Sequence, residues 1–79
     1  MREKLVITFQ GASGDARKLA GVLWRECLIE RECRVSDSDG VAKLRATATN
    51  GRVPVVDSAK AFLAANHLGA PTVALDMGS

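Results

Sequence analysis

The glycine-rich segment Gly11-Ala12-Ser13-Gly14 is the first place in this sequence where residue types and spacing suggest binding chemistry. It joins a predicted strand to a predicted helix, and free backbone N–H groups at a helix N-terminus bind anions such as phosphate. Gly11, Ser13 and Gly14 are therefore candidate anion-binding residues. The segment matches neither of the two established phosphate-binding glycine motifs, and Asp15 adds a negative charge beside it. We prefer the simpler interpretation of a tight turn followed by a helix cap.

A second candidate site consists of the basic residues Arg34, Lys43, Arg45 and Arg52. If the residues around Arg34 and those from 41 to 49 form neighbouring strands, the first three side chains share one face of a sheet, because side chains alternate along a strand. We expect Arg52 to lie close by, across a hairpin. Such a face could bind an acidic protein surface or the phosphates of a nucleic acid.

The aromatic residues argue against one form of nucleic-acid binding. Sheets that recognise RNA stack the bases on exposed aromatic side chains. This chain has no tyrosine, and we predict core positions for Phe9, Trp24 and Phe62. Trp24 lies at the margin of the apolar face of its helix, so an exposed position as an interface anchor is the alternative for that residue. A nucleic-acid-binding module that uses the basic face stays open as an alternative, but it would lack that stacking contribution.

The cysteines, the histidine and the paired aspartates predict no catalytic or metal site. Cys27 and Cys33 lack the spacing of a zinc site, and we expect both to be buried as small apolar residues. His67 is predicted to lie in the last turn of a helix, where a cation favours the helix dipole. Asp37 and Asp39 resemble the start of a calcium-binding loop, but the glutamate that completes such a loop is missing. We expect no catalytic residue, no metal and no cofactor.

The elements that position these residues follow from the periodicity of the apolar side chains. Apolar residues recur with helical spacing after Ser13, the predicted helix cap, and they alternate with polar ones in the predicted strands. The predicted elements are a strand over 4–9, a helix over 16–29, a strand around 33–36, a turn at 37–40, a strand over 41–49, an extended edge piece over 52–56, a helix from 57 or 58 to 68, and a strand over 72–77. Gly69 is the predicted cap at the end of the second helix.

Segment 41–49 decides between two folds. Its alanines permit a helix, but Leu44, Ala46 and Ala48 alternate with Arg45, Thr47 and Thr49, which favours a strand. The pair Asn50-Gly51 then predicts a hairpin. The resulting α+β order resembles the ferredoxin-like βαββαβ plan or a close variant, with two helices on one face of a mixed or antiparallel sheet. The alternative, with 41–49 helical, is a small βαβαβαβ domain.

Length and composition limit the remaining possibilities. The 79 residues predict one compact domain over 1–79, and 47% hydrophobic with 25% charged residues is typical of a folded soluble chain. The net charge of +2 is mixed along the sequence. No apolar run has the length of a signal peptide or a membrane span. We therefore expect a cytoplasmic protein, without membrane contact, that is a monomer or a homodimer.

These observations favour a small binding protein that acts through a protein partner and is not an enzyme. Adaptors, immunity or antitoxin partners, and inhibitors of bacterial defence systems carried by phages or mobile elements, such as anti-CRISPR-type inhibitors, are proteins of this kind. Two alternatives are a nucleic-acid-binding module that uses the basic face, and a small enzyme subunit that binds an anionic ligand at the loop from Gly11 to Gly14.

Overall fold

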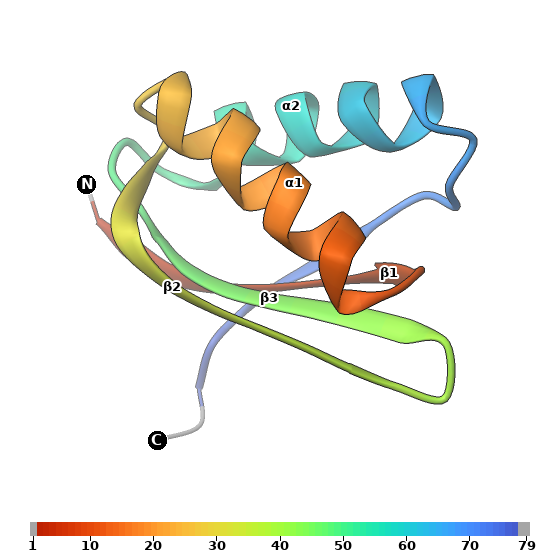
Figure 1. Cartoon of the computed structure of the whole chain (residues 1–79). Coiled ribbons are helices and arrows are strands. Elements are labelled where there is room, and N and C mark those ends of the chain that lie inside the picture. Colours follow the sequence, from red (N-terminus) through yellow and green to blue (C-terminus); the bar gives the residue numbers. More distant parts are fainter. Residues whose placement is uncertain (1, 78–79) are drawn as a thin grey trace.

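Two helices pack on one face of a four-stranded antiparallel sheet in this protein, for which a computed structural model describes residues 2–77 (Figure 1). The strand order is β2-β3-β1-β4. The elements, in chain order, are β1 Glu3–Gln10, α1 Ser13–Arg25, β2 Ile29–Ser38, β3 Val41–Ala48, α2 Arg52–Ala65 and β4 Thr72–Leu75. This confirms the predicted ferredoxin-like plan or a close variant. The alternative fold is wrong, because residues 41–48 form a strand.

The core lies between the sheet and the two helices. Strict alternation along β1 and β3 sends every second side chain toward the helices, as the period of a strand requires. The alanines of β3 face inward and are small, so the helices can pack close to the sheet. The largest fully buried side chains are Leu5, Ile7, Leu19, Leu23, Leu44, Val55 and Leu63.

Helix α1 buries the predicted apolar stripe but is shorter than predicted at its C-terminal end. Its buried residues include Leu19 and Leu23, and it ends at Arg25 instead of continuing to Ile29. Cys27 has a φ of 60°. Its N–H donates to the carbonyl of Trp24, and the N–H of Leu28 donates to the carbonyl of Leu23, both at 2.9 Å. This Schellman arrangement ends the helix. Ser13 is the first helical residue and not the predicted cap, since the N-cap position belongs to Ala12.

The hairpin between β2 and β3 turns at Asp39-Gly40. Both residues have positive φ, 55° and 77°, which a two-residue hairpin turn of this type requires. Ser38 and Val41 are the last paired residues on either side of the turn. The register between β2 and β3 is irregular between Ile29 and Cys33, and β2 is longer than the predicted piece around 33–36.

Helix α2 corrects two predictions. It begins at Arg52, so segment 52–56 is helical and not an extended edge piece. Asn50-Gly51 forms no hairpin; it lies in the short connection from β3 to α2. Pro54 lies in the first turn of the helix, where a residue without an N–H is tolerated because that N–H would have no helical partner.

The C-terminal end of α2 also differs from the prediction. The helix ends at Ala65, and His67 takes the left-handed conformation, with a φ of 59°. Leu68 N–H bonds to the carbonyl of Leu63 at 2.8 Å, which makes a second Schellman arrangement. The predicted cap, Gly69, lies two residues beyond His67. Strand β4 ends at Leu75, before the predicted Met77.

Candidate binding surface on the open face of the sheet

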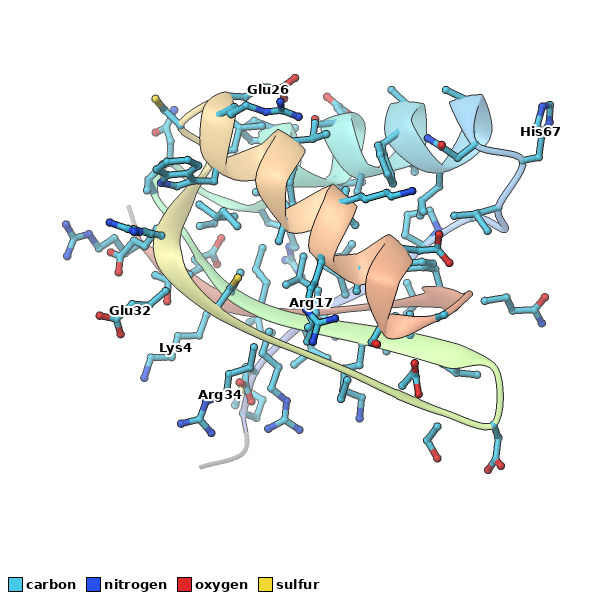
Figure 2. All side chains as sticks on the ribbon, viewed as in Figure 1. Lys4, Arg17, Glu26, Glu32, Arg34 and His67 are labelled. Atoms are coloured by element: carbon cyan, nitrogen blue, oxygen red, sulfur yellow. The ribbon has the colours of Figure 1, made fainter. Side chains whose placement is uncertain are left out.

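The side of the sheet opposite the helices forms a polar surface, which we call the open face. Figure 2 shows Lys4 and Arg34 extending from this side, away from both helices. The strand registers identify its members, because residues that alternate with the buried positions must point outward. The open face comprises Lys4, Val6, Thr8, Arg34, Ser36, Lys43, Arg45, Thr47, Thr72 and Ala74.

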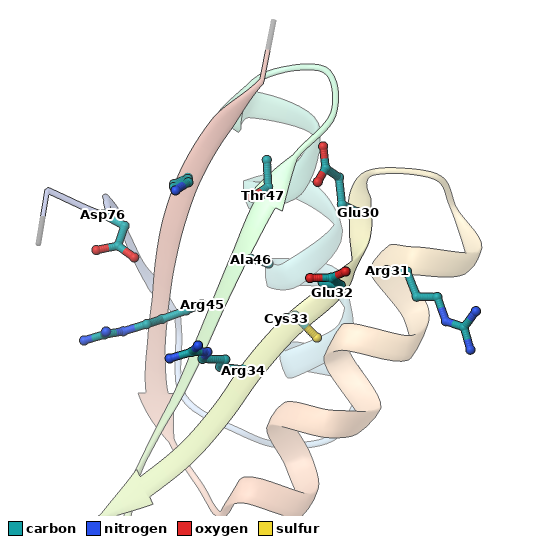
Figure 3. Close-up of a pocket in the computed structure, with 10 residues that line it drawn as sticks. Glu30, Arg31, Glu32, Cys33, Arg34, Arg45, Ala46, Thr47 and Asp76 are labelled. Carbon is teal, nitrogen blue, oxygen red and sulfur yellow. The ribbon is translucent and has the colours of Figure 1, made fainter. Parts of the chain in front are cut away.

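Arg34 and Arg45 lie directly opposite each other on β2 and β3. Both side chains are exposed, and Figure 3 shows them side by side. Like charges at directly opposed positions destabilise a sheet. Within residues 2–77, no salt bridge neutralises either arginine. Lys43, two positions along β3, adds a third cation on the same face.

The two arginines line an open hollow of about 830 Å³ (Figure 3). Lys4 extends its basic side, whereas Glu30, Glu32 and Asp76 supply carboxylates around it. The hollow therefore offers charges of both signs.

Glu30 has a cationic partner within the chain. Its carboxylate forms an ion pair with Arg2, with 3.0 Å between Oε2 and Nε. Glu32 extends from β2 on the same side as Lys4 and Arg34 (Figure 2). The surface around Arg34 and Arg45 thus combines a basic centre with an acidic margin.

Sequence analysis identified part of this surface. Arg34, Lys43 and Arg45 share one face of the sheet, as expected from the alternation of β3. Arg52 does not join them across a hairpin, because it is the first residue of α2. Lys4 was missed, although its alternation with Leu5 in β1 was a usable signal. Glu32 was missed because the predicted second strand began too late.

The loop from Gly11 to Gly14 already holds two carboxylates of the chain itself. Ala12 N–H donates to Oδ2 of Asp15 at 3.0 Å, and Ser13 N–H donates to Oδ2 of Asp37 at 2.6 Å. Gly11 N–H donates to the carbonyl of Gly40 at 2.8 Å. Two of the N–H groups in the loop that could hold an external anion are therefore already bonded to carboxylates.

Several other expectations about side chains need correction. Cys27 and Cys33, expected to be buried, are free thiols and both are exposed. Trp24, expected in the core, is 49% exposed. It lines an apolar hollow of about 500 Å³ together with Phe62 of α2. His67 lies just beyond α2, and not in its last turn.

Within residues 2–77, no group of three or more His, Cys, Asp or Glu side chains is placed to hold a metal ion. The described helices are too short or too polar to cross a membrane. Comparisons with protein families, with curated proteins and with solved structures give no match for this chain.

Proposed function

We propose that this chain is a small binding protein that acts through a protein partner, and that the open face of the sheet binds an acidic surface of that partner. The supporting observation is the opposed pair Arg34 and Arg45. The pair costs stability in the isolated chain, and an anionic group bound between the two side chains would remove that cost. Arginine is also well suited to this role, because its planar guanidinium binds carboxylates through two parallel hydrogen bonds.

The composition of the open face favours a protein over a nucleic acid as its ligand. Single-stranded nucleic acids bind through base stacking on aromatic side chains, and the open-face residues defined above include none. Glu32 at the margin would repel phosphates, whereas a partner protein can present a basic side chain to it and acidic ones to the arginines.

In this proposal the chain is an adaptor or an inhibitor that works by covering the partner's surface, without catalysing a reaction. We place it in the cytoplasm, where the exposed thiols of Cys27 and Cys33 would stay reduced. An immunity protein or an inhibitor of a bacterial defence system would work in this way.

The proposal can be tested by capture with the immobilised chain from a nuclease-treated bacterial lysate, followed by binding measurements at increasing salt. We expect a specific protein to be retained after nuclease treatment. A nucleic-acid ligand would be lost on nuclease treatment, and its log affinity would fall with log salt with a slope of about −0.9 per neutralised phosphate. That result would overturn the proposal in favour of the nucleic-acid alternative.

A further inference from the structure

Strand β2 forms one edge of the sheet, and its outer side is free. Its pairing with β3 is regular from Cys33 to Ser38 and irregular between Ile29 and Cys33. The edge contains no proline, and within residues 2–77 no segment pairs with it on that side. A free edge presents unpaired N–H and C=O groups, which pair readily with a strand of another chain. The other edge, β4, has only four residues. Pairing through β2 therefore offers the longer ladder.

Hydrogen bonds at the ends of the strands identify which residues face outward. In antiparallel pairs, successive residues bond alternately to one neighbour and to the other. Gly11 N–H bonds to Gly40 C=O on the β1 side of β3, and Thr49 N–H bonds to Leu28 C=O on the β2 side. The even-numbered residues of β3 thus bond to β1 and the odd-numbered ones to β2.

The same alternation can be followed into β2. Arg34 is paired with Arg45, an odd-numbered residue of β3, so its backbone groups face β3. The backbone N–H and C=O groups of its neighbours Cys33 and Val35 consequently face the free side. A second strand would form its hydrogen bonds with these two residues.

The charges of β2 select one way of pairing two copies of this edge. Two identical antiparallel strands pair about a two-fold axis, so residues equally distant from the axis lie opposite each other. With the axis at Cys33, Glu32 of each copy lies opposite Arg34 of the other. This gives two ion pairs on the open face, each between a glutamate and an arginine. With the axis at Glu32 or at Arg34, like charges would oppose each other instead.

We infer that the chain forms a homodimer in which the β2 edges of two copies pair antiparallel about a two-fold axis at Cys33. The product is one continuous eight-stranded sheet. All four helices lie on one side, and the two open faces join on the other. Each Arg34 then gains Glu32 of the second copy as its counterion, which also lowers the cost of its position opposite Arg45. The dimer needs no third component, although it uses Arg34 and Glu32, which also belong to the proposed partner surface.

The test is sedimentation equilibrium of the purified chain and three variants, Glu32→Arg, Arg34→Glu and the double exchange of both. We expect the natural chain to be a dimer. Each single change places like charges opposite each other twice and should weaken the dimer at least tenfold. The double exchange recreates both ion pairs with the charges reversed, and it should restore most of the dimer. Circular dichroism checks that each variant is folded.

Cysteine cross-linking tests the position of the axis. A bis-maleimide should join two copies of Cys27→Ser, which keeps Cys33 beside the axis, far more efficiently than two copies of Cys33→Ser. The variant Lys43→Glu/Arg45→Glu should remain a dimer, because neither residue lies on the edge. A natural chain that stays monomeric, a double exchange that stays monomeric while the natural chain dimerises, or equal cross-linking of the two cysteine variants would each overturn the inference.

Discussion

Asp37 is the residue through which the hairpin of β2 and β3 holds the start of α1. Its carboxylate accepts the N–H of Ser13 at 2.6 Å, at the end of the helix where the dipole favours negative charge. We predict that Asp37→Ala lowers the free energy of unfolding by about 1 kcal/mol, as the loss of a helix cap does. Urea denaturation measures the change. Asp57→Ala, which removes an exposed carboxylate from α2, is the control, and equal losses in the two variants would contradict this role of Asp37.

His67 takes a left-handed conformation that a glycine adopts without strain. Its φ is 59° and its side chain is exposed. We predict that His67→Gly raises the free energy of unfolding by about 1 kcal/mol, because a side chain with a Cβ is strained in this conformation. His67→Ala keeps the Cβ and should leave stability nearly unchanged. Thermal melts of the two variants decide the matter, and a gain for alanine as large as that for glycine would refute the explanation.

At the scale of the elements, α2 begins without the charges that favour a helix start. Its first turn contains no acidic residue, and Val53 is 71% exposed there. We predict that Val53→Glu stabilises the protein by about 0.3–1 kcal/mol through the helix dipole, and that Val53→Lys destabilises it. Thermal melts at low and high salt provide the measurement. The difference between the two variants should shrink at high salt, and a difference independent of salt would exclude the dipole as its cause.

The sequence predicted those elements that are amphipathic with a clear period. The buried stripe of α1 and the alternation of β3 are confirmed, because one face of each element is in the core. The start of α2 was not predictable in the same way. Asn50-Gly51 is a strong hairpin signal and Pro54 a strong signal against a strand, but a proline is equally compatible with the first turn of a helix. Only packing of Val55 and Ala59 in the core distinguishes the two.

The sequence predicted where only some of the candidate residues lie. The shared face of Arg34, Lys43 and Arg45 follows from the two-residue period of two paired strands, which the sequence contains. The exposure of Cys33 depends on β2 being an edge strand, and strand order is a property of the whole fold. The sequence showed Asp15 beside the loop from Gly11 to Gly14. The bond from Ser13 to Asp37 joins residues 24 positions apart, so no local pattern could have shown this second carboxylate.

At the scale of the whole molecule, the core that stabilises the fold and the proposed binding surface lie on opposite faces of the sheet. The helices cover one face of the sheet, and the buried apolar core lies between them. The open face therefore carries charges that do not contribute to this core. Arg45 opposite Arg34 is the clearest case, because the pair opposes folding while it suits an anionic ligand. A change at this position should therefore affect stability and partner binding in opposite directions.

The most direct test of the open face is the dissociation constant of the captured partner for Lys43→Glu/Arg45→Glu, compared with Arg17→Glu/Lys60→Glu. Both double variants change the net charge equally, but the second pair lies on the exposed surfaces of α1 and α2. We predict that the first variant loses partner binding at least a hundredfold. It should melt no lower than the natural chain, because the carboxylate introduced at position 45 would face Arg34 with the opposite charge. The helix variant should bind almost normally. Equal binding by the two double variants would contradict the proposed role of the open face.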